Sequence, residues 1–221
     1  MASRLFGFLG AAVLVLASSP ATAGRSKPRR VPNMPRGWSW PANPAMAEAG
    51  KRCLDGLRER NVAFQGGHAK KVNTPILLPT MELAGIRLEP TWRKGPFVLD
   101  CHLALALHAM APELKTLGVS ALRFSTIHDH RYVKRNGRKT NILSRHAIGL
   151  AMDIFEVRLD DGRVLKVKRS YASETVLHDV ERVFARSDRF RTPLTPSNDP
   201  KGHDDHFHLE ARMPLRSVLA Q

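Results

Sequence analysis

Two short motifs, far apart in the sequence, most strongly constrain how this chain can fold. The first spans residues 144–153 and reads Ser-Arg-His-Ala-Ile-Gly-Leu-Ala-Met-Asp; the second spans residues 203–208 and reads His-Asp-Asp-His-Phe-His. In the second motif and the Leu-Glu that follows, apolar and polar residues alternate, which predicts a strand with His206 and His208 on one face. A loop leading into a strand over residues 149–157 would bring the histidine and the aspartate of the first motif together. We therefore expect a fold in which these two segments meet.

The side chains of both motifs are of the types that bind zinc. Zn²⁺ takes histidine nitrogen and aspartate oxygen, and a catalytic zinc site uses three protein ligands and leaves a fourth position to water. The second motif alone holds three of the 10 histidines of the chain. The alternative is a surface cluster of histidines and acids that hydrogen-bond without a metal, and each motif taken alone leaves it open.

The first 23 residues predict a secretory signal peptide. Arg4 precedes an apolar run over residues 5–17, and Ala-Thr-Ala over residues 21–23 is a small-residue cleavage site. The run is too short to span a membrane, and no cysteine follows the cleavage site, which excludes a lipoprotein. No other apolar run approaches the length of a span. We expect a periplasmic or secreted protein without a transmembrane segment.

The formal net charge of +15 indicates an anionic partner. In a cytosolic protein such a charge would point to nucleic acid. The signal peptide and the small number of aromatic residues among the basic ones argue against nucleic acid. Anionic polymers of a cell envelope are therefore the expected electrostatic partners, and a merely solvated basic surface is the alternative.

Residues 24–45 are basic and rich in proline, which predicts a linker that buries no core, with Trp38 and Trp40 as packing anchors. Residues 46–213 predict one α+β domain, a small antiparallel sheet with flanking helices, followed by a tail over residues 214–221. The expected helices span residues 45–61, 99–117 (broken or kinked at Pro112) and 172–186 (capped by Ser170 or Ser173). The expected strands span residues 62–65, 76–78, 81–88 and 119–127, with a hairpin of residues 149–159 and 163–167 around Asp-Asp-Gly.

The chain has only two cysteines, Cys53 and Cys101. In an oxidising compartment an isolated pair predicts a disulfide, which would join the first two expected helices. Their spacing does not fit a cysteine-based zinc site.

Together the two motifs resemble those of the LAS metallopeptidases, which include zinc D-alanyl-D-alanine carboxypeptidases, D-Ala-D-Ala dipeptidases and murein endopeptidases. This resemblance implies the same DD-peptidase-like fold. It implies that His146, Asp153 and His208 bind zinc, and it places Asp205 at the position of the catalytic acid. His203 and His206 match further active-site histidines, and Ser144 and Gly149 belong to the first motif.

The order of the segments also resembles the extensin-like C-terminal domain, a bacterial branch related to the LAS peptidases. The matching pieces are the Cys53 helix with the Asn-Val-Ala-Phe that follows it, the Leu-Asp-Cys start of the next helix, and both motifs, over about residues 49–212. Many members carry Tyr-x-Cys-Arg before the first motif, whereas this chain has His-Asp-His-Arg over residues 128–131. This alignment makes Arg131 the counterpart of an arginine that polarises a carbonyl or binds a carboxylate.

These resemblances imply a zinc-dependent D,D-carboxypeptidase or murein endopeptidase that hydrolyses an amide bond of peptidoglycan with metal-activated water. The general base is Asp205, or else His206 or His203, because each could take the proton of that water. The alternative function is a non-catalytic cell-wall-binding or structural module of the same fold. The sequence leaves open which peptide bond is cut and which oligomer forms.

Overall fold

The computed structural model describes residues 31–135 and 137–215. The predicted signal peptide, the first part of the predicted linker and the end of the predicted tail lie outside the described residues. The helices are α1 (Pro44–Glu59), α2 (Cys101–Thr116), the 3-10 turn η1 (Arg145–Ile148), α3 (Val167–Ser170) and α4 (Thr175–Arg186). The strands are β1 (Gln65–Gly66), β2 (Pro75–Leu77), β3 (Glu82–Leu83), β4 (Ile86–Pro90), β5 (Leu99–Asp100), β6 (Val119–Thr126), β7 (Tyr132–Arg135), β8 (Arg138–Leu143), β9 (Ala151–Leu159), β10 (Val164–Lys166) and β11 (Phe207–Glu210).

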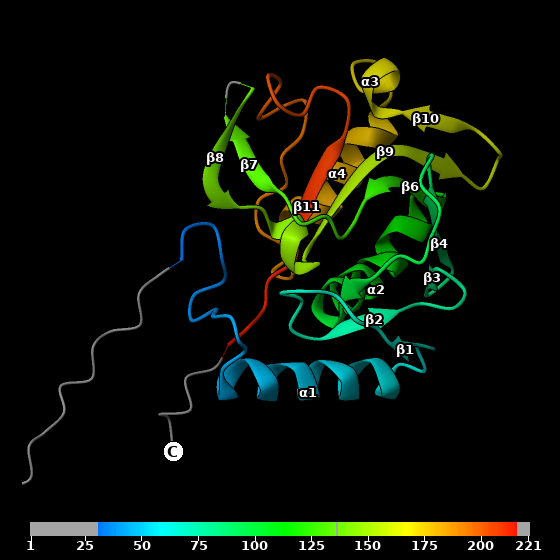
Figure 1. Ribbon diagram of the computed structural model, residues 1–221. Coiled ribbons are helices and arrows are strands. Elements are labelled where there is room, and N and C mark those ends of the chain that lie inside the picture. Colours follow the sequence, from blue (N-terminus) through cyan, green and yellow to red (C-terminus); the bar gives the residue numbers. More distant parts are fainter. Residues whose placement is uncertain (1–30, 136, 216–221) are drawn as a thin grey trace, which may run out of the picture.

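A six-stranded mixed sheet forms the centre of the fold (Figure 1). Its strands follow the order β10-β9-β6-β4-β3, and β11 also pairs with β9. Because β6 occupies one edge of β9, β10 and β11 share the other edge. The α+β class is confirmed, but the expectation of a purely antiparallel sheet is wrong, since β4 and β6 are parallel. The chain crosses between these two strands through α2, and such a crossover permits parallel pairing.

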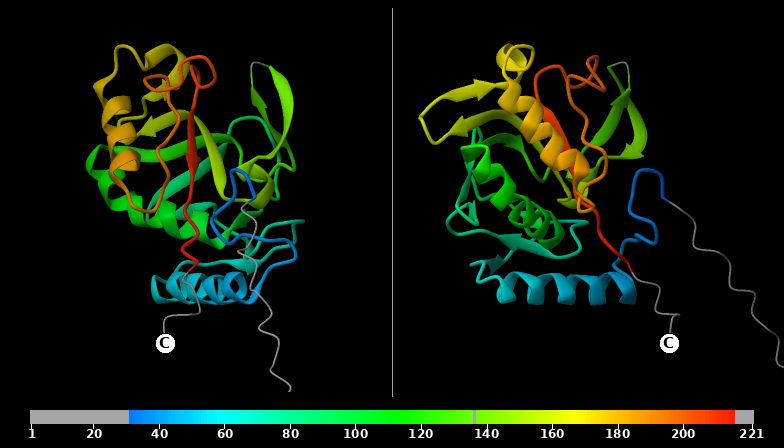
Figure 2. Two further views of the ribbon diagram at one scale, coloured as in Figure 1. Left: turned by 90° about the vertical axis from the view of Figure 1, so that its left-hand side faces the viewer. Right: turned by 180° about the vertical axis from the view of Figure 1, so that it is seen from behind.

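Helix α2 lies between the central sheet and α1 (Figure 1). It packs on β4 and β6 and on α1, and α4 lies beside it in the view from behind (Figure 2). The predicted disulfide is confirmed: Cys53 of α1 is bonded to Cys101, the first residue of α2, with a Cα–Cα distance of 6.0 Å. A bridge of this kind stabilises a fold by about 2–4 kcal/mol.

Several element boundaries differ from the sequence-based expectation. The strand expected over residues 62–65 is wrong for its first three residues, because the Val62 amide hydrogen-bonds back to the Leu57 carbonyl at the end of α1. Helix α2 starts two residues later than expected, because the Asp100 side chain caps it. The helix also continues past Pro112, so the expected break is wrong.

The helix expected over residues 172–186 begins later as well. Ser170 ends the short helix α3, and its carbonyl accepts the backbone amides of Ser173 and Glu174. These bonds form a turn between the two helices. Helix α4 then starts at Thr175 with no side-chain cap, so neither serine has the expected capping role.

The described part of the predicted linker packs on the domain. Met34 and Trp38 are 2% and 8% exposed and belong to the hydrophobic core, so the expectation that this stretch buries no core is wrong for these residues. Trp38 is the expected anchor, whereas Trp40 is 43% exposed. Among the described helices, none combines the length and the apolar character needed to cross a membrane.

Candidate metal centre

A single 3-10 turn positions the histidine of the first motif. The Ser144 hydroxyl accepts a hydrogen bond from the backbone N–H of His146 at 3.3 Å and caps η1. Gly149 ends the turn with φ 68°, and a Cβ there would lie 2.8 Å from the backbone nitrogen of Asp100. This position accepts only glycine without strain. Both residues therefore hold the loop conformation that directs His146 into the fold.

Two antiparallel strands bring Asp153 and His208 together. Asp153 of β9 and His208 of β11 are direct partners in the register of this strand pair (Figure 1 shows the two strands side by side). Direct partners project their side chains to the same face of a sheet. The pairing of β9 with β11 thus joins the two sequence motifs.

The three side chains form a compact buried cluster. His208 Nδ1 lies 2.7 Å and His146 Nε2 lies 3.1 Å from Asp153 Oδ1, and the two ring nitrogens are 3.3 Å apart. One ligand atom of each residue lies within 4.8 Å of the others. Two imidazoles and one carboxylate are the donor set of a three-ligand metal site, so the residues present fit a metal ion.

The other nitrogen of each histidine has its own acceptor. His146 Nδ1 donates to the Ile127 carbonyl oxygen at 2.8 Å, and His208 Nε2 lies 3.2 Å from Glu210 Oε1. Such contacts fix the tautomer and the ring orientation of a metal-binding histidine. The two remaining nitrogens, His146 Nε2 and His208 Nδ1, both contact Asp153 Oδ1 and are the atoms that could bind a metal.

The cluster holds a buried carboxylate whose negative charge requires a positive partner. Burial opposes the ionised form of Asp153, yet His146 and His208 hold the pKa of its carboxyl well below the usual value. Burial lowers the pKa of His146. Burial also opposes a charge on His208, but hydrogen bonds to Asp153 and Glu210 outweigh it and raise the pKa of His208 to about 9. A proton on His208 can balance the buried carboxylates, and so can a divalent cation held by the same atoms.

An aspartate–histidine pair borders the cluster. Asp205 Oδ1 lies 2.6 Å from His206 Nδ1, and the other ring nitrogen, Nε2, lies 3.6 Å from Asp153 Oδ1. The ring of Phe155 stacks on His206 with centroids 4.8 Å apart and planes inclined by 13°. The His206 ring is therefore fixed from two sides, with its free nitrogen turned to the ligand cluster.

The remaining predicted residues also lie at this site. Arg131 Nη2 is 3.0 Å from Asp153 Oδ2, which places a positive charge against the carboxylate. His203 Nδ1 contacts Asp199 at 2.8 Å, and its ring lies 4.8 Å from that of His206. The structure thus brings together all seven residues that the sequence pointed to as ligands or catalytic groups: Arg131, His146, Asp153, His203, Asp205, His206 and His208.

The family model of the extensin-like protein C-terminus matches residues 51–218, which is well over half of the chain. The chain belongs to this family. No curated protein and no solved structure matches it. The matched part of this extensin-like protein contains the disulfide and both motifs, as the order of its segments predicts.

One residue of the extensin-like site was missed in the sequence. Glu210 contacts His208 Nε2 and also pairs with Arg191, so it supports a candidate ligand from behind. The alternation that places His206 and His208 on one strand face includes residue 210 as well, and this pattern could have identified it. Its ion pair with Arg191, which lies in the loop after α4, is not visible in this local pattern.

Proposed function

We propose that this extensin-like protein is a zinc-dependent peptidase that hydrolyses an amide bond in peptidoglycan. The observation that supports the proposal is the Asp205–His206 pair, whose free nitrogen faces a buried trio of candidate ligands. A site that only held a structural metal would need no oriented base beside the ligands. The ligands would be His146, Asp153 and His208, and when bound, zinc polarises a carbonyl and lowers the pKa of water toward neutrality.

In this proposal the chain moves the proton through His206. Its Nε2 accepts the proton of the attacking water and returns it to the leaving amine, as a general base and then acid must. Asp205 holds Nδ1 at 2.6 Å and stabilises the protonated ring, so it acts as the orienting partner. This is one of the assignments that the sequence left open among Asp205, His206 and His203.

Arg131 and His203 lie at the same site and have different proposed roles. Arg131 carries a permanent charge that can stabilise the negative oxygen of the tetrahedral intermediate or bind a substrate carboxylate. His203, fixed by Asp199, lies beside His206 and can hydrogen-bond the substrate. The kinship with LAS peptidases, a periplasmic or secreted location and anionic envelope polymers as partners belong to this proposal and rest on the sequence motifs, the predicted leader and the net charge.

Metal analysis and digestion of cross-linked muropeptides test the proposal. We expect one zinc per chain, release of a stem-peptide fragment, loss of this activity with a chelator and recovery with zinc. Because two histidines and one carboxylate also bind Fe(II), the metal is identified in protein purified without added metal. Full zinc occupancy without any turnover would overturn the peptidase and favour the cell-wall-binding module.

A further inference from the structure

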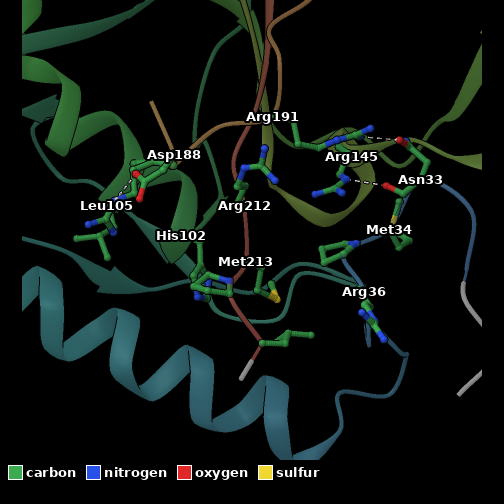
Figure 3. A pocket seen from close by; sticks show the side chains of 15 residues that line it. Asn33, Met34, Arg36, His102, Leu105, Arg145, Asp188, Arg191, Arg212 and Met213 are labelled. Atoms are coloured by element: carbon green, nitrogen blue, oxygen red, sulfur yellow. Dashed lines mark hydrogen bonds and ion pairs between the residues drawn. The ribbon is translucent and has the colours of Figure 1, made fainter. Parts of the chain in front are cut away.

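A pocket that lies away from the three candidate ligands is lined by five arginines. Its volume is about 660 Å³, and none of the ligand trio lines it. Figure 3 shows Arg145, Arg191 and Arg212 gathered on one side, with His102 and Leu105 of α2 across from them. The arginines that line the pocket are Arg36, Arg145, Arg189, Arg191 and Arg212, and Asp188 is the single lining carboxylate among the described residues.

Arg145 is the central group, because its charge is buried and forms no ion pair with a carboxylate among the described residues; Glu210 acts on this charge only from a greater distance. Arg145 is 5% exposed, and its guanidinium donates to two backbone carbonyls, those of Asn33 at 2.6 Å and Ala211 at 3.4 Å. Burial lowers its pKa to about 10, so it is still charged at neutral pH. A buried charge is costly unless an opposite charge compensates it.

The neighbouring arginines leave the pocket with excess positive charge. Among the described residues, neither Arg36 nor Arg212 forms an ion pair with a carboxylate; Arg212 donates to the Phe190 carbonyl at 2.8 Å. Arg191 is paired with Glu210, and Arg189 lies 3.5 Å from the exposed Asp188. Guanidinium groups in such a cluster repel one another, and an oxyanion between them would relieve this repulsion.

Apart from the arginines, Asn33, His102 and Asp188, the lining is apolar. It includes Met34, Leu105, Ala106, Met213 and Leu215. A pocket of this volume with apolar walls and a few charged groups is typical of sites for small organic molecules. The ligand should therefore combine a multiply charged oxyanion with an apolar part.

We propose that this arginine pocket binds a phosphate monoester that carries an apolar group. A phosphate monoester has a charge of about −1.5 to −2 at neutral pH and three acceptor oxygens, which suits several guanidinium donors better than a single carboxylate. The ligand is either a free molecule or the headgroup of a lipid, because both present the same chemistry. The proposal does not depend on the function of the metal centre.

Calorimetric titration with 1-naphthyl phosphate tests the proposal in the presence of a chelator, so that a metal plays no part. We expect saturable one-to-one binding that weakens at high salt. Inorganic phosphate and the uncharged 1-naphthol should both bind at least about tenfold more weakly. Inorganic phosphate lacks the apolar group, and 1-naphthol lacks the phosphate. Equal binding of 1-naphthol would contradict an oxyanion site.

The variants separate binding from folding. Arg145→Gln removes the buried charge but could disturb the core, so the main test is the double variant Arg36→Gln/Arg212→Gln, in which both residues are exposed. It should bind 1-naphthyl phosphate at least about tenfold more weakly at an unchanged melting temperature. The control Arg52→Gln removes an exposed arginine of α1 that pairs with Glu48, outside the pocket, and should bind as the wild type does.

A vesicle arm identifies the source of the ligand. If phosphatidic acid in phosphatidylcholine vesicles competes with 1-naphthyl phosphate, and the double variant does not bind these vesicles, the ligand is a lipid headgroup. If the vesicles do not compete while the soluble probe binds, the ligand is a free phosphate monoester. Unchanged affinity of the double variant for the soluble probe would overturn the proposal.

Discussion

The candidate metal centre and the arginine pocket are built from neighbouring residues but balance their charges differently. In η1, His146 faces the metal centre while the preceding Arg145 lines the pocket. At the metal centre, Asp153, Asp199 and Asp205 each contact a histidine. In the arginine pocket, by contrast, the buried Arg145 donates hydrogen bonds only to neutral backbone carbonyls among the described residues.

This difference indicates what each site lacks. The metal centre has oriented nitrogen and carboxylate donors, so it is suited to a small cation that replaces a proton. The arginine pocket has cationic donors and apolar walls, so it is suited to a larger anion. Glu210 lies between them, with one oxygen near His208 and the other paired with Arg191, and it makes the comparison testable.

Loss of a ligand histidine should produce the largest effect. We expect His146→Ala and His208→Ala to reduce zinc from one per chain to almost none, because two ligands cannot complete the site. Metal analysis after dialysis measures this. Both variants should still bind 1-naphthyl phosphate, which also shows that they are folded. Full zinc occupancy in both variants would show that the ligands lie elsewhere.

Changes in the Asp205–His206 pair should affect turnover and leave the metal in place. His206→Ala should lower kcat on muropeptides by about 10²–10⁴-fold, the usual contribution of a general base. Asp205→Asn should cost less, because the ring keeps a neighbour but loses the charge that stabilises its protonated form. Zinc content and kcat are measured on the same samples.

The control for this pair is Asp204→Asn. Asp204 has a side chain that is 60% exposed and lies 3.7 Å from Lys168 on the surface, so its loss should leave kcat unchanged. If Asp205→Asn removes more activity than His206→Ala, Asp205 itself accepts the proton, and the assignment reverses.

The sequence predicted which residues come together at the candidate metal centre, but it did not predict how they contact one another. The ligand trio was implied by the resemblance of two local motifs to those of the LAS metallopeptidases, whereas strand alternation alone placed only His206 and His208 on one face. The contact between Asp205 and His206 depends on the conformation of the turn before β11. The sequence pattern does not specify this conformation. The parallel β4–β6 pair was missed for a similar reason, because it depends on a crossover through α2 that the sequence shows only as a helix.

The arginine pocket could not be predicted from the sequence. Its five arginines come from four separate segments. These are the segment before α1 (Arg36), η1 (Arg145), the loop after α4 (Arg189 and Arg191) and the segment after β11 (Arg212). Arg145 appears in the first motif only as a spacer between Ser144 and His146. Basic residues are frequent throughout this chain, so no local signal distinguishes these five from the others.

Glu210→Gln should shift the two sites in opposite directions. It removes the carboxylate behind His208, and loss of such a partner typically weakens metal binding about 10–100-fold. It also releases Arg191 from its ion pair, so 1-naphthyl phosphate should bind several-fold more tightly. Competition with a zinc chelator and calorimetry measure the two affinities. Parallel weakening of both would mean that the variant is merely unstable.

The smallest expected effect concerns Trp92, which connects the metal centre to the surface. Its side chain is 64% exposed and packs edge-to-face on Phe155 with ring centroids 5.4 Å apart, and Phe155 in turn stacks on His206. An exposed aromatic face at this distance can stack on a substrate, which contributes about 1 kcal/mol.

Trp92→Ala should therefore raise KM for muropeptides about fivefold and leave kcat unchanged, since the contact is equally strong in the bound substrate and the transition state. Trp92→Phe should restore most of the affinity. Trp40→Ala is the matched control, because Trp40 is the other exposed tryptophan among the described residues and lies before α1. A fall in kcat for Trp92→Ala would instead mean that Trp92 acts through Phe155 to hold His206 in position.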